Sequence, residues 1–155
     1  MMRKLIDYMS DDHNRLDGIF KVFRQMKTQD AKKAMELLHA FKAGLKRHIL
    51  WEEEILFPLV EGRIGAMNGE ATSAMREEHR DIQNLLEVLH AKMVHNDSAT
   101  DGPERALVDA LTAHGEKEKN GLYPMIDDSI DERRRVEIYK GMKDLSPERY
   151  NRCCE

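Results

Sequence analysis

The chain has 155 residues, with 25 Lys or Arg against 29 Asp or Glu, so its formal net charge is −4. This length predicts one domain whose core is large enough to fold without disulfides, and the acidic balance argues against a nucleic-acid partner. No apolar run approaches the roughly 20 residues that cross a bilayer, and the first residues lack the apolar block of a signal peptide. We therefore expect a cytoplasmic protein with no membrane partner.

The two cysteines, Cys153 and Cys154, are adjacent and close to the C-terminal end. They cannot link distant parts of a core, which excludes a disulfide framework. We expect them in an exposed tail, with a redox or metal-binding role as the alternative.

The composition favours helices, because only 9 Gly and 4 Pro interrupt segments rich in Ala, Leu, Glu, Lys and Met. Turn-forming residues divide the chain at 28–30, 62–69 and 96–103. Asp30 is the expected N-cap of the second segment, whereas Asp101 is the expected cap of the fourth. The result is four helical segments joined by short connections.

Each segment carries one apolar seam, in which residues recur at alternating steps of three and four. The first seam runs from Ile6 to Phe23, and the same spacing returns in the other segments. Short links between such helices predict an all-α, up-down-up-down antiparallel four-helix bundle over residues 1–128. Residues 129–155 are expected to form a C-terminal extension with one short helix and an unstructured tail from Ser146.

Near the middle of each helix, the seam is interrupted by residues that are costly to bury. They are His13, His48, Glu52, His79, His114 and Glu118. One buried histidine is common in a core, but six such residues in one small bundle would cost several kcal/mol for each unpaired charge. Either a cation holds these side chains or the seams are misassigned.

An internal repeat decides between these alternatives, because the same residue types recur 66 positions apart. The matched pairs are His13 and His79, His48 and His114, Glu52 and Glu118, and Pro58 and Pro124. The shared template is His-x3-Glu-x4-aromatic-Pro, which indicates two copies of one helical hairpin. Residues four apart lie on the same helix face, so each His-x3-Glu can direct an imidazole and a carboxylate at one metal region.

Four imidazoles and two carboxylates exceed the ligand set of one tetrahedral zinc, so a pair of first-row metals suits them better. If both carboxylates bridge, each metal receives two nitrogens and two carboxylate oxygens, and an oxo or hydroxo bridge adds a fifth ligand. One position on each metal then stays open for water or a small diatomic ligand. Iron, manganese and zinc are all compatible with these ligand types.

The order His, His-x3-Glu, His, His-x3-Glu on successive helices resembles the hemerythrin-like (HHE cation-binding) family over about residues 5–127. The resemblance implies two Fe ions, with Glu52 and Glu118 as bridging ligands. It implies terminal ligands at His13, His48, His79 and His114.

Two departures separate the chain from the oxygen-carrying hemerythrins, which it otherwise resembles. Those proteins have a fifth His one turn from a third-helix ligand, where this chain has Met75 or Gln83. They also have an Asp in the final bridging position, where this chain has Glu118. In both respects the chain is more similar to hemerythrin-like domains of iron–sulfur cluster repair proteins and of bacterial stress-linked proteins. The position of His13, close to the first residue, leads us to expect no cysteine-bearing N-terminal domain of the repair-protein type.

From this resemblance we expect a non-heme diiron protein that binds or reacts with O2, NO or peroxide, in oxidative or nitrosative stress or in oxygen or iron sensing. The alternatives are an iron-delivery or iron–sulfur cluster repair factor and a binding-only iron or oxygen sensor. Whether the protein is an enzyme stays open, and its small-molecule partner is a diatomic ligand or a peroxide. No further His or carboxylate lies on a seam, so any activity is expected to reside in the metals and not in a protein acid or base.

Several neighbouring residues are weaker candidates. Glu53 and Glu54 follow Glu52 but lie off the seam, so solvated charges are expected, with an alternative bridge as the other interpretation. Tyr123 and Phe57 share a repeat position and are expected to pack in the core, although the Tyr123 phenol could donate a hydrogen bond or transfer an electron. The remaining histidines are expected on the surface: His39, His90 and His95.

Overall fold

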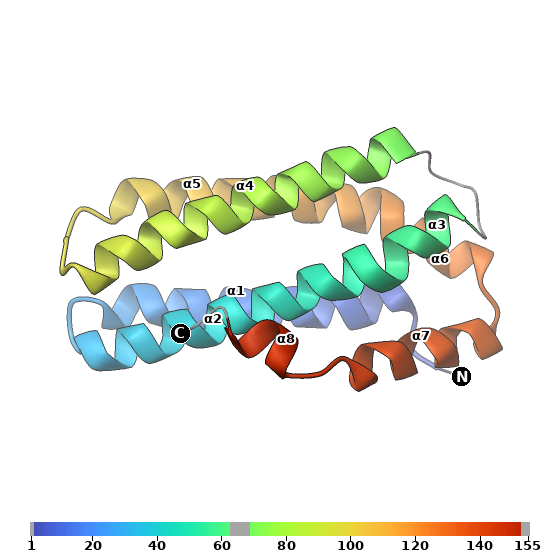
Figure 1. The fold of residues 1–155 in the computed structure, drawn as a ribbon, viewed down its shortest axis with the longest axis horizontal. Helices are drawn as coiled ribbons and strands as arrows, with labels where there is room; N and C mark the ends of the chain where they lie inside the picture. The colour runs from blue at the N-terminus through green and yellow to red at the C-terminus, as the bar shows by residue number, and fades with distance from the viewer. Residues whose placement is uncertain (1, 63–68, 153–155) are drawn as a thin grey trace.

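The computed structural model describes residues 2–62 and 69–152, and every regular element in these ranges is helical. Long helices lie side by side along one axis (Figure 1). They are α1 (Leu5–Met26), α2 (Ala31–Trp51), α4 (Gly69–Val94) and α5 (Asp101–Lys117). The predicted all-α bundle is confirmed. In the described ranges, no helix combines the length and apolarity needed to span a membrane.

Two of the long helices continue through a π-helical turn, which the sequence analysis did not predict. Helix α2 leads into η1 (Glu52–Leu56) and α3 (Phe57–Glu61), and α5 leads into η2 (Glu118–Leu122) and α6 (Tyr123–Ser129). Each π turn begins at a repeat glutamate and ends just before a repeat proline. Proline lacks an N–H and clashes with the carbonyl four residues earlier in an α-helix, so the wider turn accommodates it.

The core consists of two apolar clusters that lie on either side of the polar seam residues. One cluster contains Phe20, Phe41 and Leu107, and the other contains Met9, Phe57 and Tyr123. Gly44 brings α2 close to α1, since a Cβ at this position would lie 2.6 Å from Leu16 Cδ2. The apolar packing on both sides holds the polar layer between the clusters in place.

The C-terminal extension packs against the bundle near the polar layer. Helix α7 (Glu132–Asp144) contributes Tyr139, whose hydroxyl donates to the Arg3 carbonyl at 2.6 Å, and the Met142 carbonyl accepts from Trp51 Nε1 at 3.2 Å. The predicted unstructured tail from Ser146 is wrong, because residues Glu148–Asn151 form α8. An ion pair of 2.8 Å between Arg149 and Glu54 holds this short helix, and such a distant contact has no local sequence signal. Cys153 and Cys154 lie outside the described residues.

The start of α2 is capped by a local residue, the start of α1 is capped by a distant one, and the predicted cap of α5 does not form. The Asp30 side chain accepts from Lys33 N, as predicted for the N-cap of α2. Helix α5 already begins at Asp101, after an N-cap at Thr100 that makes no side-chain capping bond, so the predicted Asp101 cap is wrong. The N-terminus of α1 is capped from α6, where Asp127 accepts from the Leu5 and Ile6 amides at 2.7 and 3.0 Å.

A buried ion-pair network joins the C-terminal end of α1 to the start of α5. The Glu104 carboxylate is completely buried and accepts from Arg24 Nε at 2.9 Å and from the Lys27 ammonium. Lys27 also bonds to Thr100 Oγ1 at 3.1 Å and to Asp101 at 2.9 Å. The repeat aligns Glu104 with the apolar residue Leu38. The repeat therefore does not predict a matching polar network between α4 and α2.

We expect Glu104→Ala to lower the free energy of unfolding by about 2 kcal/mol or more, because the substitution removes the buried carboxylate that pairs with both Arg24 and Lys27. Urea denaturation measures the loss. Glu36→Ala is the matched control, since Glu36 is 58% exposed and lies 3.8 Å from Lys33. The control should change stability by less than about 0.5 kcal/mol. Equal losses in the two variants would show that burial adds nothing to the Glu104 contacts.

Candidate metal centre

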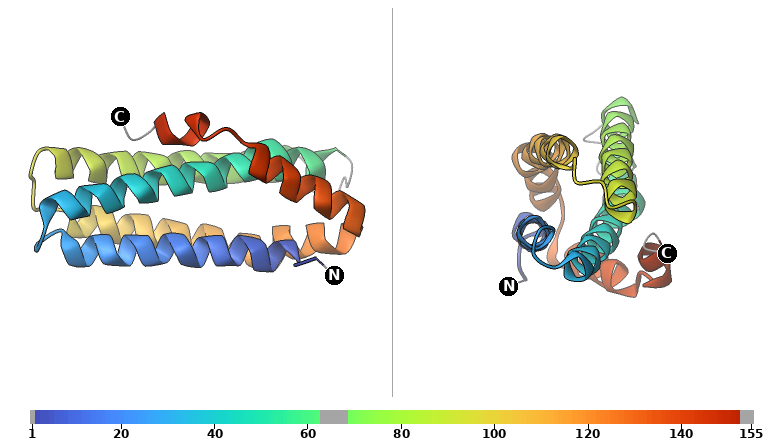
Figure 2. Two further views of the ribbon diagram at one scale, coloured as in Figure 1. Left: turned by 90° about the horizontal axis from the view of Figure 1, so that it is seen from below. Right: turned by 90° about the vertical axis from the view of Figure 1, so that its left-hand side faces the viewer.

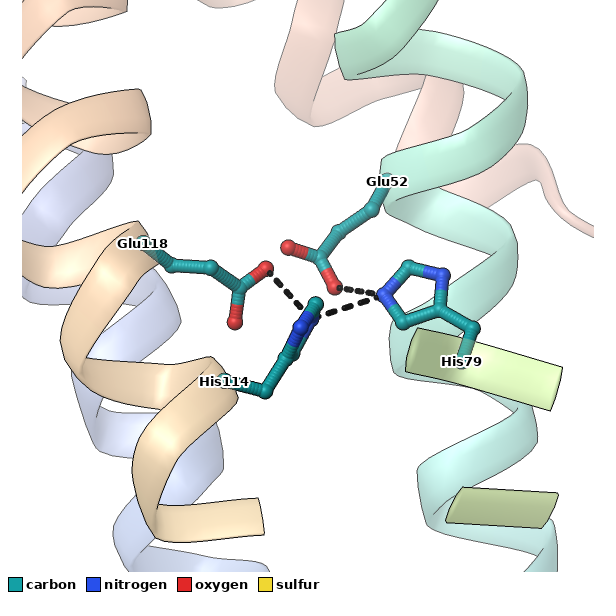
Figure 3. A group of neighbouring side chains, drawn as sticks. All are labelled: Glu52, His79, His114 and Glu118. Atoms are coloured by element: carbon teal, nitrogen blue, oxygen red, sulfur yellow. Dashed lines mark hydrogen bonds and ion pairs between the residues drawn. The ribbon is translucent and has the colours of Figure 1, made fainter. Parts of the chain in front are cut away.

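The second hairpin and Glu52 bring four ligand-type side chains together at the middle of the bundle (Figure 3). The Nε2 atoms of His79 and His114 lie 2.9 Å apart. Glu52 Oε1 is 3.3 Å from His79 Nε2, and Glu118 Oε2 is 3.5 Å from His114 Nε2. The π turns begin at these two glutamates, so the local helix geometry changes where the carboxylates enter the site.

The first hairpin supplies a matching pair of histidines. The Nε2 atoms of His13 and His48 lie 2.8 Å apart, and Glu118 Oε1 is 3.5 Å from His13 Nε2. Glu118 therefore directs one oxygen toward each histidine pair. Glu52 uses one atom for both pairs, since Oε1 also lies 3.7 Å from His48 Nε2. The structure brings all six predicted residues to one place.

The donor atoms of this layer fit a metal cation better than they fit one another. Glu118 is fully buried and Glu52 is 1% exposed, yet Glu52 Oε1 and both carboxylate oxygens of Glu118 accept no hydrogen bond within the described part of the chain. A buried carboxylate without a partner is costly, and a cation removes that cost. Imidazole nitrogens with carboxylate oxygens are typical ligands of first-row transition metals.

Two further carboxylates orient the histidines from outside the layer, and the sequence analysis missed both. His48 Nδ1 donates to Asp12 at 2.8 Å, and His114 Nδ1 donates to Glu78 at 3.0 Å. This leaves each Nε2 lone pair free for a metal. Asp12 and Glu78 precede His13 and His79 directly and are themselves 66 residues apart, which is the signal that could have revealed them.

The pKa values of the ionisable groups follow from burial and from these contacts. Burial opposes ionisation of Asp12, but its hydrogen bond to His48 and the charges of His48 and Arg15 outweigh burial and lower its pKa to about 2. Burial and the neighbouring His48 lower the pKa of His13 to about 4. Burial alone would also lower the pKa of His79, yet the neighbouring carboxylates of Glu52 and Glu53 raise it to about 9. These two carboxylates thus favour the charged form of His79.

Tyr123 contacts the site as well as the core, so packing alone does not describe it. Its hydroxyl donates to Glu52 Oε2 at 3.1 Å and lies 3.3 Å from His48 Nε2 and 3.4 Å from His13 Nε2. Burial and the Glu52 charge raise the pKa of this phenol well above its usual value, which keeps the donor protonated. Phe57, at the same repeat position, stacks on the His79 ring with centroids 5.7 Å apart.

The weaker candidates have mixed outcomes. Glu54 is exposed, as predicted, whereas Glu53 is partly buried with Oε1 3.7 Å from His79 Nδ1. His95 is exposed, but the prediction of surface positions is wrong for His39 and His90. These two rings are partly buried and contact each other with centroids 5.3 Å apart, because α2 and α4 pack together there.

The chain is similar to bacterial proteins of known name. The chain is similar to the iron-sulfur cluster repair protein YtfE of Escherichia coli O157:H7, with 30% identity over 64% of this chain and 40% of that protein. The YtfE protein of Cronobacter sakazakii is 32% identical over 59% of this chain and 44% of its own length. The chain therefore spans less than half the length of these curated relatives. No solved structure matches it significantly.

The sequence profile of the hemerythrin HHE cation-binding domain matches residues 4–126. The match includes all six residues of the polar layer and both outer carboxylates, and it ends within α6. The chain belongs to the hemerythrin HHE cation-binding domain family.

Proposed function

We propose that the polar layer binds two iron ions and that this centre binds or reacts with O2, NO or peroxide. The six ligands would be His13, His48, Glu52, His79, His114 and Glu118. The observation that carries the proposal is a set of buried carboxylate oxygens that accept no hydrogen bond from the described residues and that face two separate histidine pairs. Bound iron would supply electrons and open coordination positions for a small ligand.

The geometry of Glu118 supports a pair of metals over a single one. Its two oxygens lie 3.5 Å from a histidine nitrogen in each hairpin, as a bridging carboxylate requires. Glu52 would be the other shared ligand, since its Oε1 lies 3.3 Å from His79 Nε2 and 3.7 Å from His48 Nε2. Asp12 and Glu78 hold the imidazoles of His48 and His114 in the ligating tautomer.

Iron delivery or iron–sulfur cluster repair is the second candidate function. The observation that favours it is the similarity to proteins named as iron-sulfur cluster repair proteins, although this chain covers only part of their length. Both functions need the same metal layer. They differ in whether iron stays in the layer and reacts with a small molecule or leaves for another protein.

The first prediction for this site concerns metal content. Wild-type protein should contain about two iron atoms per chain, and Glu118→Ala should lose both because this carboxylate faces both histidine pairs. His79→Ala should weaken mainly one metal, since His79 belongs to one pair. Elemental analysis after expression with added iron measures both effects. One zinc per chain, or no metal, would contradict the diiron proposal.

The second prediction tests small-molecule chemistry directly. Reduced, iron-loaded protein should consume NO or hydrogen peroxide, and His48→Ala should reduce the rate at least tenfold. The matched control is His95→Ala, which removes an exposed histidine far from the layer and should leave the rate unchanged. Equal rates in wild type and His48→Ala would contradict an iron-based reaction. Iron transfer to an apo iron–sulfur protein, without consumption of NO or peroxide, would favour the second candidate.

The third prediction concerns Tyr123, the polar side chain that touches Glu52 without belonging to the ligand set. Tyr123→Phe should leave both metals bound and change reaction rates at most several-fold, because Phe57 already occupies the equivalent repeat position. Iron analysis and NO consumption provide the measurements. A loss of activity as complete as that in Glu118→Ala would instead identify Tyr123 as a catalytic phenol.

A further inference from the structure

A cavity of about 220 Å3 adjoins the metal layer and reaches toward the surface between α1 and α5. Seen along the bundle axis, these two helices lie on the same side of the molecule (Figure 2). The cavity walls next to the histidines are apolar and include Leu16 and Leu111. Its outer residues are exposed and polar: Asp17, Thr112, Glu116 and Lys119.

Comparison of the two repeats explains why, among the described residues, the cavity opens between α1 and α5 and not between α2 and α4. The opposite side of the layer, between α2 and α4, has Ile49 where the open side has Gly115. Ile49 is 2% exposed and forms part of the inner wall of the cavity, and Phe57 stacks on the nearby His79 ring. The consequence is seen in the ligands themselves, since the His13 side chain is 17% exposed and that of His79 is 2% exposed.

Gly115 lies where α5 faces His13, at the inner end of this cavity. A Cβ built on Gly115 would be 3.5 Å from both Cε1 and Nδ1 of His13, an ordinary contact distance. An alanine would therefore fit, whereas a branched side chain would extend further into the space beside the imidazole. A glycine in mid-helix also costs about 1 kcal/mol relative to alanine, so the open space is not explained by helix stability.

We propose that Gly115 keeps open the route by which small uncharged molecules reach the metal layer between α1 and α5, an inference that rests on the proposed function. The apolar walls disfavour a charged ligand, which would lose its hydration there without a partner. Asp17 and Glu116 at the outer end repel anions, and Lys119 offsets one of the two negative charges. The route therefore selects O2, NO and hydrogen peroxide over anions of similar size.

The test replaces Gly115 by the residue that the repeat carries at the closed side. Gly115→Ile should slow NO association with the reduced, iron-loaded protein at least tenfold, with iron content and melting temperature close to wild type. Gly115→Ala should slow association less than threefold. Gly18→Ile is the matched control, because Gly18 is an exposed glycine of α1 with no atom within 4 Å of a built Cβ.

A second measurement does not depend on any reaction at the metals. Xenon binds apolar cavities, so crystals of the iron-loaded wild type and Gly18→Ile under xenon pressure should show a xenon atom near Leu16 and Leu111. Gly115→Ile should lack it.

Xenon bound in the wild type without any NO or peroxide reaction would reject the proposed function but confirm the cavity. Unchanged NO association in Gly115→Ile would overturn the proposed route. If Gly115→Ile loses iron, the NO association rate is measured in Leu111→Trp instead. This substitution narrows the same cavity from α5, so it should also slow NO association.

The selection against anions has its own measurement. In the double variant Asp17→Lys and Glu116→Lys, the rate constant for azide binding relative to that for NO should rise at least fivefold at low salt. The rise should shrink in 0.5 M salt, where surface charges are screened. A ratio equal to that of the wild type would show that these carboxylates play no part in ligand selection.

Discussion

Two carboxylates buried in an apolar bundle are the constraint on which the rest of this structure depends. Glu52 and Glu118 present oxygens that receive no hydrogen bond within the described residues, in a layer bounded by apolar clusters on both sides. An ionised carboxylate in such a place is costly unless a metal cation or a charged side chain pairs with it. The raised pKa of His79, which lies beside Glu52 and Glu53, has the same electrostatic cause.

Duplication of a helical hairpin explains how so small a chain assembles the layer. Each copy places a His, a His-x3-Glu and a π turn at matching positions, so the imidazoles and carboxylates meet around an approximate two-fold axis. The outer carboxylates Asp12 and Glu78 follow the same symmetry. The symmetry is broken at two repeat positions: Tyr123 corresponds to Phe57, and Gly115 corresponds to Ile49.

Helices α7 and α8 stabilise the bundle from outside the repeat. Arg135 of α7 holds Asp127 of α6 at 3.2 Å, and Asp127 caps the start of α1, which carries His13 and Asp12. Trp51, which precedes Glu52, donates its indole N–H to a carbonyl of α7. Arg47 of α2 pairs with Asp12 at 3.3 Å. Its guanidinium lies over the ring of Trp51 and also near the ring of Tyr150 of α8. The extension therefore stabilises the side of the site formed by the first hairpin.

The sequence by itself determined the helical class, the apolar seams and the candidate ligand set, because these depend on local periodicity and on a repeat visible in the residue order. His13 and Glu118 could be paired with their counterparts by counting alone. Only the tertiary structure decided which helix ends are capped by distant residues, that α8 forms, and that a cavity opens beside Gly115. Those features arise from contacts between segments far apart in the chain. A local pattern contains no information about the distance at which two helices pack, so it could not reveal them.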